Sequence, residues 1–152
     1  MALPNIFNSE TTEIILKRLE NLEANSQPKW GKMNASQMLA HLNIAYDIAY
    51  GKIESKPSFV IKFLMKLFIK NGIVNEKSYP QNSRTAPEFI IADKRDFDLE
   101  KSKYIKNVRE TEVHGASYFE GKENPSMGKL TAIEWNNMFY KHTNHHFNQF
   151  GI

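Results

Sequence analysis

The feature that most limits the possible folds is the spacing of apolar residues, which recur every three or four positions in several segments, as on one face of an α-helix. The last such segment has signals at both ends: Thr131 and Glu134 form a T-x-x-E capping box, and Gly151 lies just past its expected end. The polar–apolar alternation of a strand is nowhere sustained. These patterns predict an all-α protein.

Several segments are expected to be helical, separated by breaks that contain proline or glycine. They cover residues 10–24, 34–50, 58–70, 93–110 and 132–150. The third is expected to stop at the Asn71–Gly72 pair, and residues 115–129 are expected to form a loop. Four main helices and one short accessory helix predict an antiparallel four-helix bundle, formed by a single domain over residues 1–152.

The composition narrows the functional classes. The 152 residues include 20 basic and 17 acidic side chains, and the resulting charge of +3 is too small and too dispersed to predict nucleic-acid binding. The lack of cysteine excludes a disulfide scaffold, a thiolate-bound zinc site and a cysteine nucleophile. We recognise no secretory signal and no spanning apolar run, so a soluble, cytoplasmic protein is expected.

Three of the five histidines lie on helix faces that are expected to point inward. His41 belongs to the apolar stripe of the second helix, and His142 and His146 are one turn apart on the last helix. In a bundle, such side chains can converge from facing helices, and three neutral imidazoles can hold a divalent ion while leaving a coordination position open. The spacing alone also fits core histidines that are hydrogen bonded to neighbouring carbonyl groups.

Two stretches, WGKMNASQMLAHL and EWNNMFYKHTNHHFNQFGI, resemble the DinB-like superfamily of bacterial four-helix-bundle metalloproteins, and the resemblance covers nearly the whole chain. It implies that His41, His142 and His146 are the ligands of a divalent transition metal, with zinc or nickel favoured and manganese or iron as alternatives. Gln149 falls where the family often has glutamine after its last ligand, whereas His145 is not a ligand position. We expect His145 and Gln149 to support the ligands from outside the metal site.

One loop departs from the branch of small uncharacterised proteins that the chain resembles most. That branch shares NSRTAPEF-like and GKLT-x-x-EW segments with this chain, and its loop before GKLT usually has the sequence His-Pro-Phe-Phe-Gly. Here the loop consists of Asn124, Pro125, Ser126, Met127 and Gly128, so the histidine is absent. If that histidine contacts substrate in relatives, the substrate or the activity of this chain differs.

The expected function is that of a metal-dependent enzyme acting on a small molecule. An open three-histidine ion can lower the pKa of a bound water for hydrolysis, or it can activate a low-molecular-weight thiol for transfer to an electrophile. The chain lacks the glutamate of an H-E-x-x-H motif, and the capping position of Glu134 favours a structural role over general-base catalysis. Two alternatives stay open: a non-catalytic bundle that binds a metal or ligand, and a structural protein with core histidines.

Residues 58–70 carry a separate interaction signal. Lys62, Lys66 and Lys70 recur every four residues, and the other positions are mostly Phe, Val, Ile, Leu and Met. A short basic amphipathic helix of this kind can lie on a membrane surface, but more often it covers a core or a partner subunit. Because proteins of the resembled family commonly pair, we expect a lid or a homodimer contact.

Overall fold

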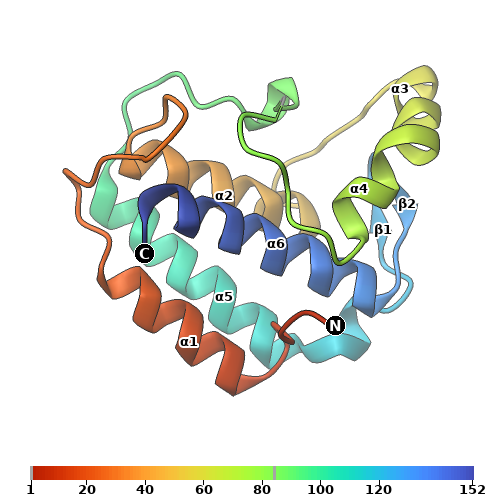
Figure 1. Cartoon of the computed structure of the whole chain (residues 1–152). Coiled ribbons are helices and arrows are strands. Elements are labelled where there is room, and N and C mark those ends of the chain that lie inside the picture. The colour runs from red at the N-terminus through yellow and green to blue at the C-terminus, as the bar shows by residue number, and fades with distance from the viewer. Residues whose placement is uncertain (1, 84) are drawn as a thin grey trace.

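The computed structural model describes residues 2–83 and 85–152 and is mostly helical (Figure 1). Its longest helices are α1 (Ser9–Glu20), α2 (Ala35–Ala49), α5 (Phe97–Phe119) and α6 (Ala132–Phe150). Helix α5 packs against the other three, and α2 also packs against α6. Within the described residues the only strands are β1 (Glu123–Asn124) and β2 (Gly128–Lys129), which pair in a short antiparallel hairpin. The prediction of a largely α-helical chain is confirmed.

Several helix ends follow the predicted caps. Asn34 and Gln37 form a capping box at the start of α2, and Thr131 and Glu134 form another at the start of α6. In each box the side chains bond backbone N–H groups that have no partner inside the helix. Gly151 ends α6 in the left-handed conformation, with a φ of 75°. These local signals therefore set both ends of the helix that carries most of the histidines.

The third helical segment was predicted to end at the Asn71–Gly72 pair, but it continues beyond this pair. It comprises α3 (Phe59–Leu64), a π-helical turn η1 (Met65–Ile69) and α4 (Lys70–Val74), and we refer to residues 59–74 as the arm. The Lys141 ammonium group donates to carbonyl groups at the end of α4, those of Gly72, Ile73 and Asn75, at 2.8, 3.0 and 2.8 Å. A cation at a helix C-terminus stabilises that end, so the helix continues past the glycine.

Helix α5 extends well beyond its predicted end at Glu110. It reaches Phe119, although Gly115 adopts a left-handed φ of 67° inside it and produces a kink. The Phe119 side chain is fully buried, and its ring stacks on that of Phe7 with centroids 5.2 Å apart. Burial of this ring favours continuing the helix after the kink, so the predicted loop is wrong for residues 115–119. Helix α1 ends at Glu20, earlier than predicted.

The core is rich in aromatic rings that join α2, α5 and α6. Tyr46 of α2 stacks on Phe139 of α6 with centroids 4.6 Å apart, and Tyr104 of α5 contacts both Tyr46 and Phe147. All four side chains are almost completely buried. The Tyr104 hydroxyl also lies 2.7 Å from Thr143 Oγ1 on α6. Because such a core is close-packed, it holds α2 and α6 in a defined register, and side chains that face across these helices meet.

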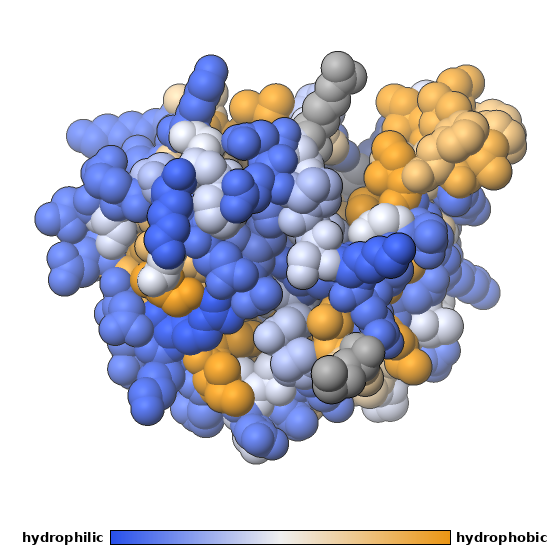
Figure 2. Space-filling view, in the orientation of Figure 1, coloured by the Kyte–Doolittle hydropathy of each residue, from blue (hydrophilic) through white to orange (hydrophobic). Residues whose placement is uncertain are grey.

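The arm stands out from the helical body (Figure 1). It exposes several apolar side chains. Figure 2 shows them as an apolar protrusion at the upper right of the molecule. Phe59 is 83% exposed, Phe68 70% and Leu67 60%. Despite this apolar character, none of the described helices combines the length and the hydropathy needed to cross a bilayer.

Candidate metal centre

His41 of α2 and His142 and His146 of α6 converge between the two helices. One nitrogen atom of each ring lies within 4.8 Å of the corresponding atoms of the other two. The Nε2 atoms of His41 and His142 are 2.7 Å apart, and the ring centroids of His41 and His146 are 4.6 Å apart. Across residues 2–83 and 85–152, this is the only group of three or more His, Asp or Glu side chains with such an arrangement.

Hydrogen bonds on the outer side of the cluster orient two of its rings. His41 Nδ1 lies 2.8 Å from the carbonyl oxygen of Phe89 in the 3-10 helix η2 (Pro87–Phe89), and His146 Nδ1 lies 2.7 Å from Gln149 Oε1. Both oxygens can only accept, so each Nδ1 carries the proton and donates it. The Nε2 atoms of His41 and His146 are then unprotonated and are available as ligands.

The Gln149 side chain is held at its other end by the loop that precedes α2. Its Nε2 atom donates to the carbonyl oxygen of Trp30 at 2.7 Å, which turns the amide oxygen toward His146. Gly31 follows in the chain with a φ of 81°, and a Cβ atom there would lie 2.5 Å from Gln149 Nε2. Glycine at position 31 therefore permits both the left-handed backbone and the close approach of the loop to α6.

The cluster consists of neutral bases. Burial lowers the pKa of His41 and lowers that of His142 well below its usual value, and it lowers the pKa of His146 to about 3. The closeness of the rings adds to this effect, because a proton on one imidazole disfavours a second proton nearby. All three imidazoles are therefore neutral near pH 7, which is the form that binds a metal ion.

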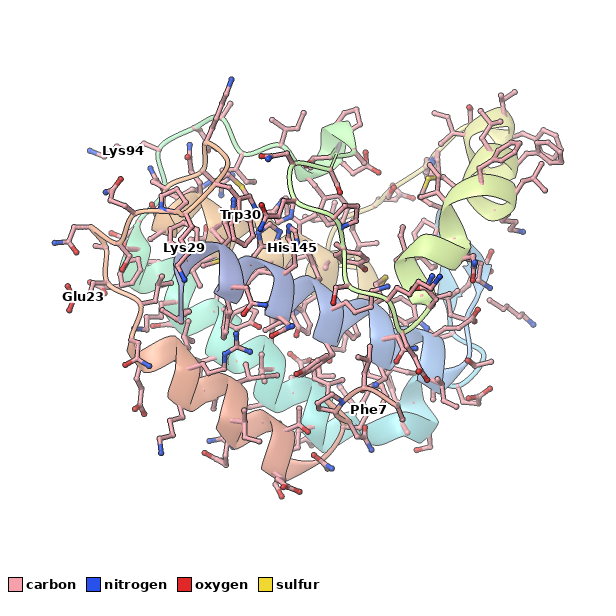
Figure 3. All side chains as sticks on the ribbon, viewed as in Figure 1. Phe7, Glu23, Lys29, Trp30, Lys94 and His145 are labelled. Carbon is pink, nitrogen blue, oxygen red and sulfur yellow. The ribbon has the colours of Figure 1, made fainter. Side chains whose placement is uncertain are left out.

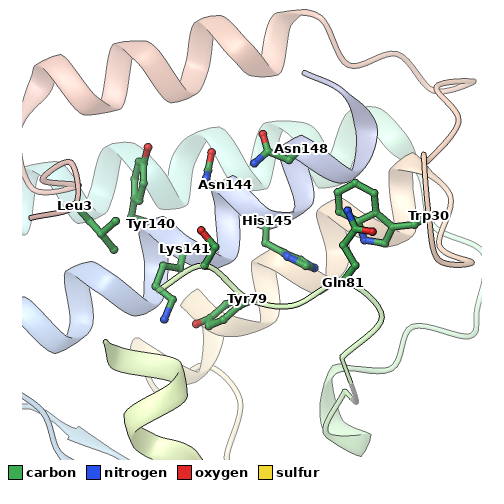
Figure 4. Close-up of a pocket in the computed structure, with 10 residues that line it drawn as sticks. Leu3, Trp30, Tyr79, Gln81, Tyr140, Lys141, Asn144, His145 and Asn148 are labelled. Carbon is green, nitrogen blue, oxygen red and sulfur yellow. The ribbon is translucent and has the colours of Figure 1, made fainter. Parts of the chain in front are cut away.

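His145 lies beside the cluster and not within it. Its ring centroid is 5.0 Å from that of His146 and 5.9 Å from those of both Trp30 and Tyr79. Figure 3 labels His145 and Trp30, and Figure 4 labels His145 with Trp30 and Tyr79. The side chains of His145, Trp30 and Tyr79 line a pocket of about 300 Å³ and also line the larger cleft at the histidine cluster. His145 therefore contributes to the wall between the two spaces, whereas Gln149 is the one that bonds a histidine of the cluster.

A cleft of about 1130 Å³ opens onto the cluster, and all three histidines line it. Its walls come from parts of the chain that are distant in sequence: the arm, the segment around η2 and the β-hairpin. Most of the side chains on these walls are apolar. Among the described residues that line the cleft, the charged ones are Lys32 and Glu88, and both are exposed. The interior of the cleft is therefore apolar around a neutral nitrogen cluster.

The loop that departs from the resembled branch also borders the cleft. Asn124 is buried, and its Oδ1 atom accepts from the backbone N–H groups of Ser126 and Met127 at 3.0 and 3.1 Å. These bonds close the turn between β1 and β2. Met127 is 5% exposed and lines the cleft. In this chain the loop therefore contributes the Met127 thioether to the cleft, while the Asn124 amide holds the turn.

The structure also locates Glu134 and His114, for which the sequence favours a structural and a surface role. Glu134 serves the cap of α6, where its Oε2 accepts from the Thr131 N–H at 2.9 Å, and its Oε1 pairs with Lys70 at 2.9 Å. His114 lies on α5, where it stacks on Tyr118. The carbonyl groups of Phe89 and Trp30 were missed entirely. No sequence pattern marks them, because every residue has a carbonyl group.

The fold and the site together define a helical protein with a buried three-histidine cluster at an apolar cleft. The chain belongs to the family described as "Protein of unknown function (DUF1569)", whose model matches residues 7–151. No curated protein and no solved structure matches the chain. The family supplies no activity, so the chemistry has to be argued from the residues of the site.

Proposed function

We propose that this protein is a metal-dependent enzyme in which His41, His142 and His146 bind one divalent transition metal, zinc or nickel in the first place. One observation carries the proposal: three neutral imidazoles, two of them oriented by outer hydrogen bonds, meet at an open cleft. We propose further that α1, α2, α5 and α6 form the antiparallel bundle of the DinB-like superfamily. The motifs around His41 and His146 support this assignment.

The donor set suits a transition metal. Imidazole nitrogen binds zinc, nickel, iron and copper well, whereas magnesium and calcium prefer the oxygen ligands that the cluster lacks. Two nitrogens on one tetrahedral zinc stand roughly 3.3 Å apart. The Nε2 atoms of His41 and His142 are 2.7 Å apart, as in a hydrogen bond. Among the described residues, His142 forms no hydrogen bond outside the cluster. Rotation of its ring can therefore increase the distance between its Nε2 atom and that of His41.

The residues around the cluster prepare it for one ion. With three protein ligands, a bound metal would act as a Lewis acid at a position open to the cleft, either on a water for hydrolysis or on the thiol of a low-molecular-weight cosubstrate. The Phe89 carbonyl and Gln149 retain the Nδ1 protons of His41 and His146 and so keep both Nε2 lone pairs directed inward. Because the chain has no cysteine, a reacting thiol has to enter from solution.

The walls of the cleft favour a small molecule whose non-reacting part is apolar. Flexible or bulky apolar side chains line it, among them Met33, Met65, Phe68, Met127 and Met138. Methionine adapts its shape to irregular apolar surfaces, and burial of apolar substrate surface is favourable. Among the described residues that line the cleft, only Lys32 and Glu88 are charged, and because both are exposed, neither is a buried partner for a charged substrate. We therefore propose an aliphatic or aromatic substrate that is uncharged away from its reacting group.

A non-catalytic metal-binding bundle is the second candidate, and one observation favours it. Among the described residues that line the cleft, Glu88 is the only carboxylate, and it lies exposed in η2. A reaction that needs a separate general base requires one within hydrogen-bonding reach of the reacting proton. The cluster itself consists of three imidazoles and includes no carboxylate. The two candidates therefore agree on metal binding and differ on turnover.

Elemental analysis of protein purified without a histidine tag tests the shared element of both candidates. We expect about one metal ion per chain, and we expect it to be lost in His146→Ala because the variant lacks one of three ligands. His114→Ala is the matched control, since it removes an imidazole outside the cluster and should retain the metal. Metal-free protein that also refuses added zinc, nickel and manganese would refute the proposal.

Turnover then separates the two candidates. Metal-loaded protein is assayed with apolar esters and amides, and with apolar electrophiles in the presence of a low-molecular-weight thiol. Turnover of either class that disappears in His146→Ala supports the enzyme. A fully loaded protein that is inactive on both classes favours the non-catalytic bundle.

A further inference from the structure

Helix α3, at the far end of the arm, is apolar on every side. Besides Lys62 it contains five apolar residues with exposed fractions between 45% and 83%: Phe59, Val60, Ile61, Phe63 and Leu64. Successive residues of an α-helix point about 100° apart, so Phe59, Val60 and Ile61 face three different directions. Figure 2 shows the apolar protrusion that the arm makes. The exposed apolar surface of α3 therefore surrounds the helix and is not confined to one face.

An apolar helix of this kind is normally surrounded by apolar groups, as in a protein core or a lipid layer. Within residues 2–83 and 85–152, no segment covers α3, since its apolar side chains keep large exposed fractions. A flat contact with another protein would bury one side of the helix and leave the other sides in water. Acyl chains can reach all sides at once. The exposure all round α3 therefore favours a lipid layer over a flat protein contact.

The arm also carries the net positive charge of the chain. Its charged residues are Lys62, Lys66 and Lys70, and residues 59–74 contain no acidic side chain. Taking these three lysines from the 20 basic side chains leaves 17, which equals the 17 acidic ones. Pairing of two arms would bring two sets of lysines together with no carboxylate in either arm, and like charges disfavour such a contact. Anionic lipid headgroups attract the same lysines.

The lysines lie between the apolar tip and the body of the protein. The Lys66 side chain lies against the hairpin at Gly128, and Lys70 pairs with Glu134 of α6 at 2.9 Å. Figure 1 shows α3 at the far end of the arm and α4 beside the body, where α4 packs against α6. Interfacial helices bury apolar side chains about 5–10 Å deep and keep cations near the headgroups. Immersion of α3 would leave the exposed Lys66 near the headgroups, and Lys62 can reach them through its alkyl chain.

We propose that the arm docks this protein on an anionic phospholipid surface, with the side chains of α3 and Leu67 inserted among the acyl chains. Burial of Phe59, Phe63 and Leu67 in the lipid supplies the apolar part of the binding, and Lys62 and Lys66 supply the electrostatic part. The contact is a surface association of one element and involves no metal ligand. It therefore stands or falls independently of the proposed enzyme.

Docking through the arm also bears on the cleft, and this step rests on the proposed function. Met65, Phe68 and Ile69 belong to the arm and line the cleft at the histidine cluster. Phe68 is also 70% exposed, so it borders both the cleft and the surface of the arm. A docked protein thus holds its apolar cleft beside the lipid layer, where apolar molecules concentrate because water excludes them. The substrate class that follows is an apolar molecule dissolved in the lipid.

Co-sedimentation of metal-free protein with vesicles tests the docking without involving the metal centre. We expect the native protein to sediment with vesicles of phosphatidylcholine and phosphatidylglycerol, and the triple variant Phe59→Ser, Phe63→Ser, Leu67→Ser to stay in the supernatant. The matched control replaces three exposed apolar residues outside the arm: Leu99→Ser, Val113→Ser and Ile133→Ser. The control should bind as the native protein does, and circular dichroism should show native helix content in both variants.

A charge variant tests the headgroup contact. A lysine near an anionic surface contributes about fivefold to the partition coefficient, so Lys62→Gln with Lys66→Gln should bind the mixed vesicles roughly 25-fold more weakly. Lys17→Gln with Lys94→Gln is the matched control, because it removes the same charge from exposed positions outside the arm. Native protein should also bind vesicles of phosphatidylcholine alone more weakly than the mixed vesicles. Equal binding by the two lysine variants would contradict the assignment of Lys62 and Lys66 to the headgroups.

A fluorescent label reports whether the arm enters the lipid, because the native chain has no cysteine that would compete for the label. An environment-sensitive dye on Phe63→Cys should shift to shorter wavelength with the mixed vesicles and be quenched by nitroxide-labelled lipid. The same dye on Val113→Cys of α5 should show neither effect. Equal changes at both positions would refute insertion through the arm.

The remaining outcomes of the vesicle experiments are also decisive. Native protein that stays in the supernatant at every lipid concentration would overturn the proposal, and so would vesicle binding that survives the triple substitution. A lipid-free dimer that the triple substitution dissociates, without vesicle binding, would assign the arm to a second copy of the chain instead. Vesicle binding by a protein that refuses zinc, nickel and manganese would support the docking and refute the proposed enzyme, so the two failures are distinguishable.

Discussion

Replacing Gln149 by leucine removes two buried hydrogen bonds at once. The amide accepts from His146 Nδ1 and donates to the Trp30 carbonyl, each at 2.7 Å, and the residue is 4% exposed. Leucine has a similar volume, but it leaves an imidazole N–H and a carbonyl group without partners. Such a group costs about 1–3 kcal/mol when it is buried. Because two groups lose their partners, we expect the free energy of unfolding of the metal-free protein to fall by about 2–6 kcal/mol.

The same substitution should weaken metal binding, because His146 loses the bond that sets its tautomer and its orientation. Loss of a partner of this kind lowers metal affinity about 10- to 100-fold. Competition with a chromophoric chelator measures the zinc Kd of the native protein and of the variant. Urea unfolding of the metal-free proteins measures the change in stability separately.

Gln149→Glu distinguishes the two roles of this side chain. A carboxylate still accepts from His146 and makes the imidazole a stronger ligand, but it cannot donate to the Trp30 carbonyl and repels that oxygen. We expect a zinc affinity at least equal to that of the native protein, together with reduced stability. Gln27→Leu, at an exposed position, is the control and should change neither quantity. An unchanged zinc Kd in Gln149→Leu would refute the reasoning that this bond orients His146.

Three further predictions concern the loop, the arm and the pH. Gly31→Ala places a Cβ atom 2.5 Å from Gln149 Nε2 at a φ of 81°, so the free energy of unfolding should fall by about 1–2 kcal/mol and zinc should bind more weakly. Native values of stability and zinc affinity in the same titrations would contradict the proposed close approach. Lys141→Met removes the cation from three carbonyl groups at the end of α4, and limited proteolysis should then cleave residues 70–75 faster, whereas an unchanged cleavage rate would show that this contact does not hold the arm. Acid should destabilise the metal-free protein. Burial lowers the pKa of His146 to about 3, while histidine in the unfolded chain titrates near 6.5. The stability is therefore fully present above 6.5 and is lost as the pH falls, by up to about 1.4 kcal/mol per pH unit for each such histidine. Urea unfolding near neutral pH and at about pH 5 measures this slope, and equal stability at the two values would show that the histidines are not buried as neutral groups.

Local sequence patterns predicted the features of this protein that depend on residues close together in the chain. The capping boxes at Asn34 and Thr131 form as expected, and Gly151 ends α6. His142 and His146 lie one turn apart and share a face, which brings both into the cluster with His41. In each case the interacting groups lie within one turn or on a periodic helix face, so the spacing along the chain contains the necessary information.

The predicted helix ends that proved wrong depend on partners from distant parts of the chain. The arm runs past Gly72 because Lys141 binds its last carbonyl groups from a position 69 residues away in the sequence. Helix α5 continues through the kink at Gly115 because the Phe119 ring is buried against Phe7. Neither partner is visible to a pattern that compares residues three or four positions apart.

The sequence by itself determined that this chain is helical, where most of its helices begin, and which histidines face inward. Only the tertiary structure decided which groups orient those histidines: the Phe89 carbonyl lies 48 residues from His41, and the Trp30 carbonyl lies 119 residues from Gln149. It also formed the cleft from the arm, η2 and the hairpin. The physical reason is that backbone carbonyl groups are the same in every residue, so their roles depend on which segments pack together and not on which amino acids carry them.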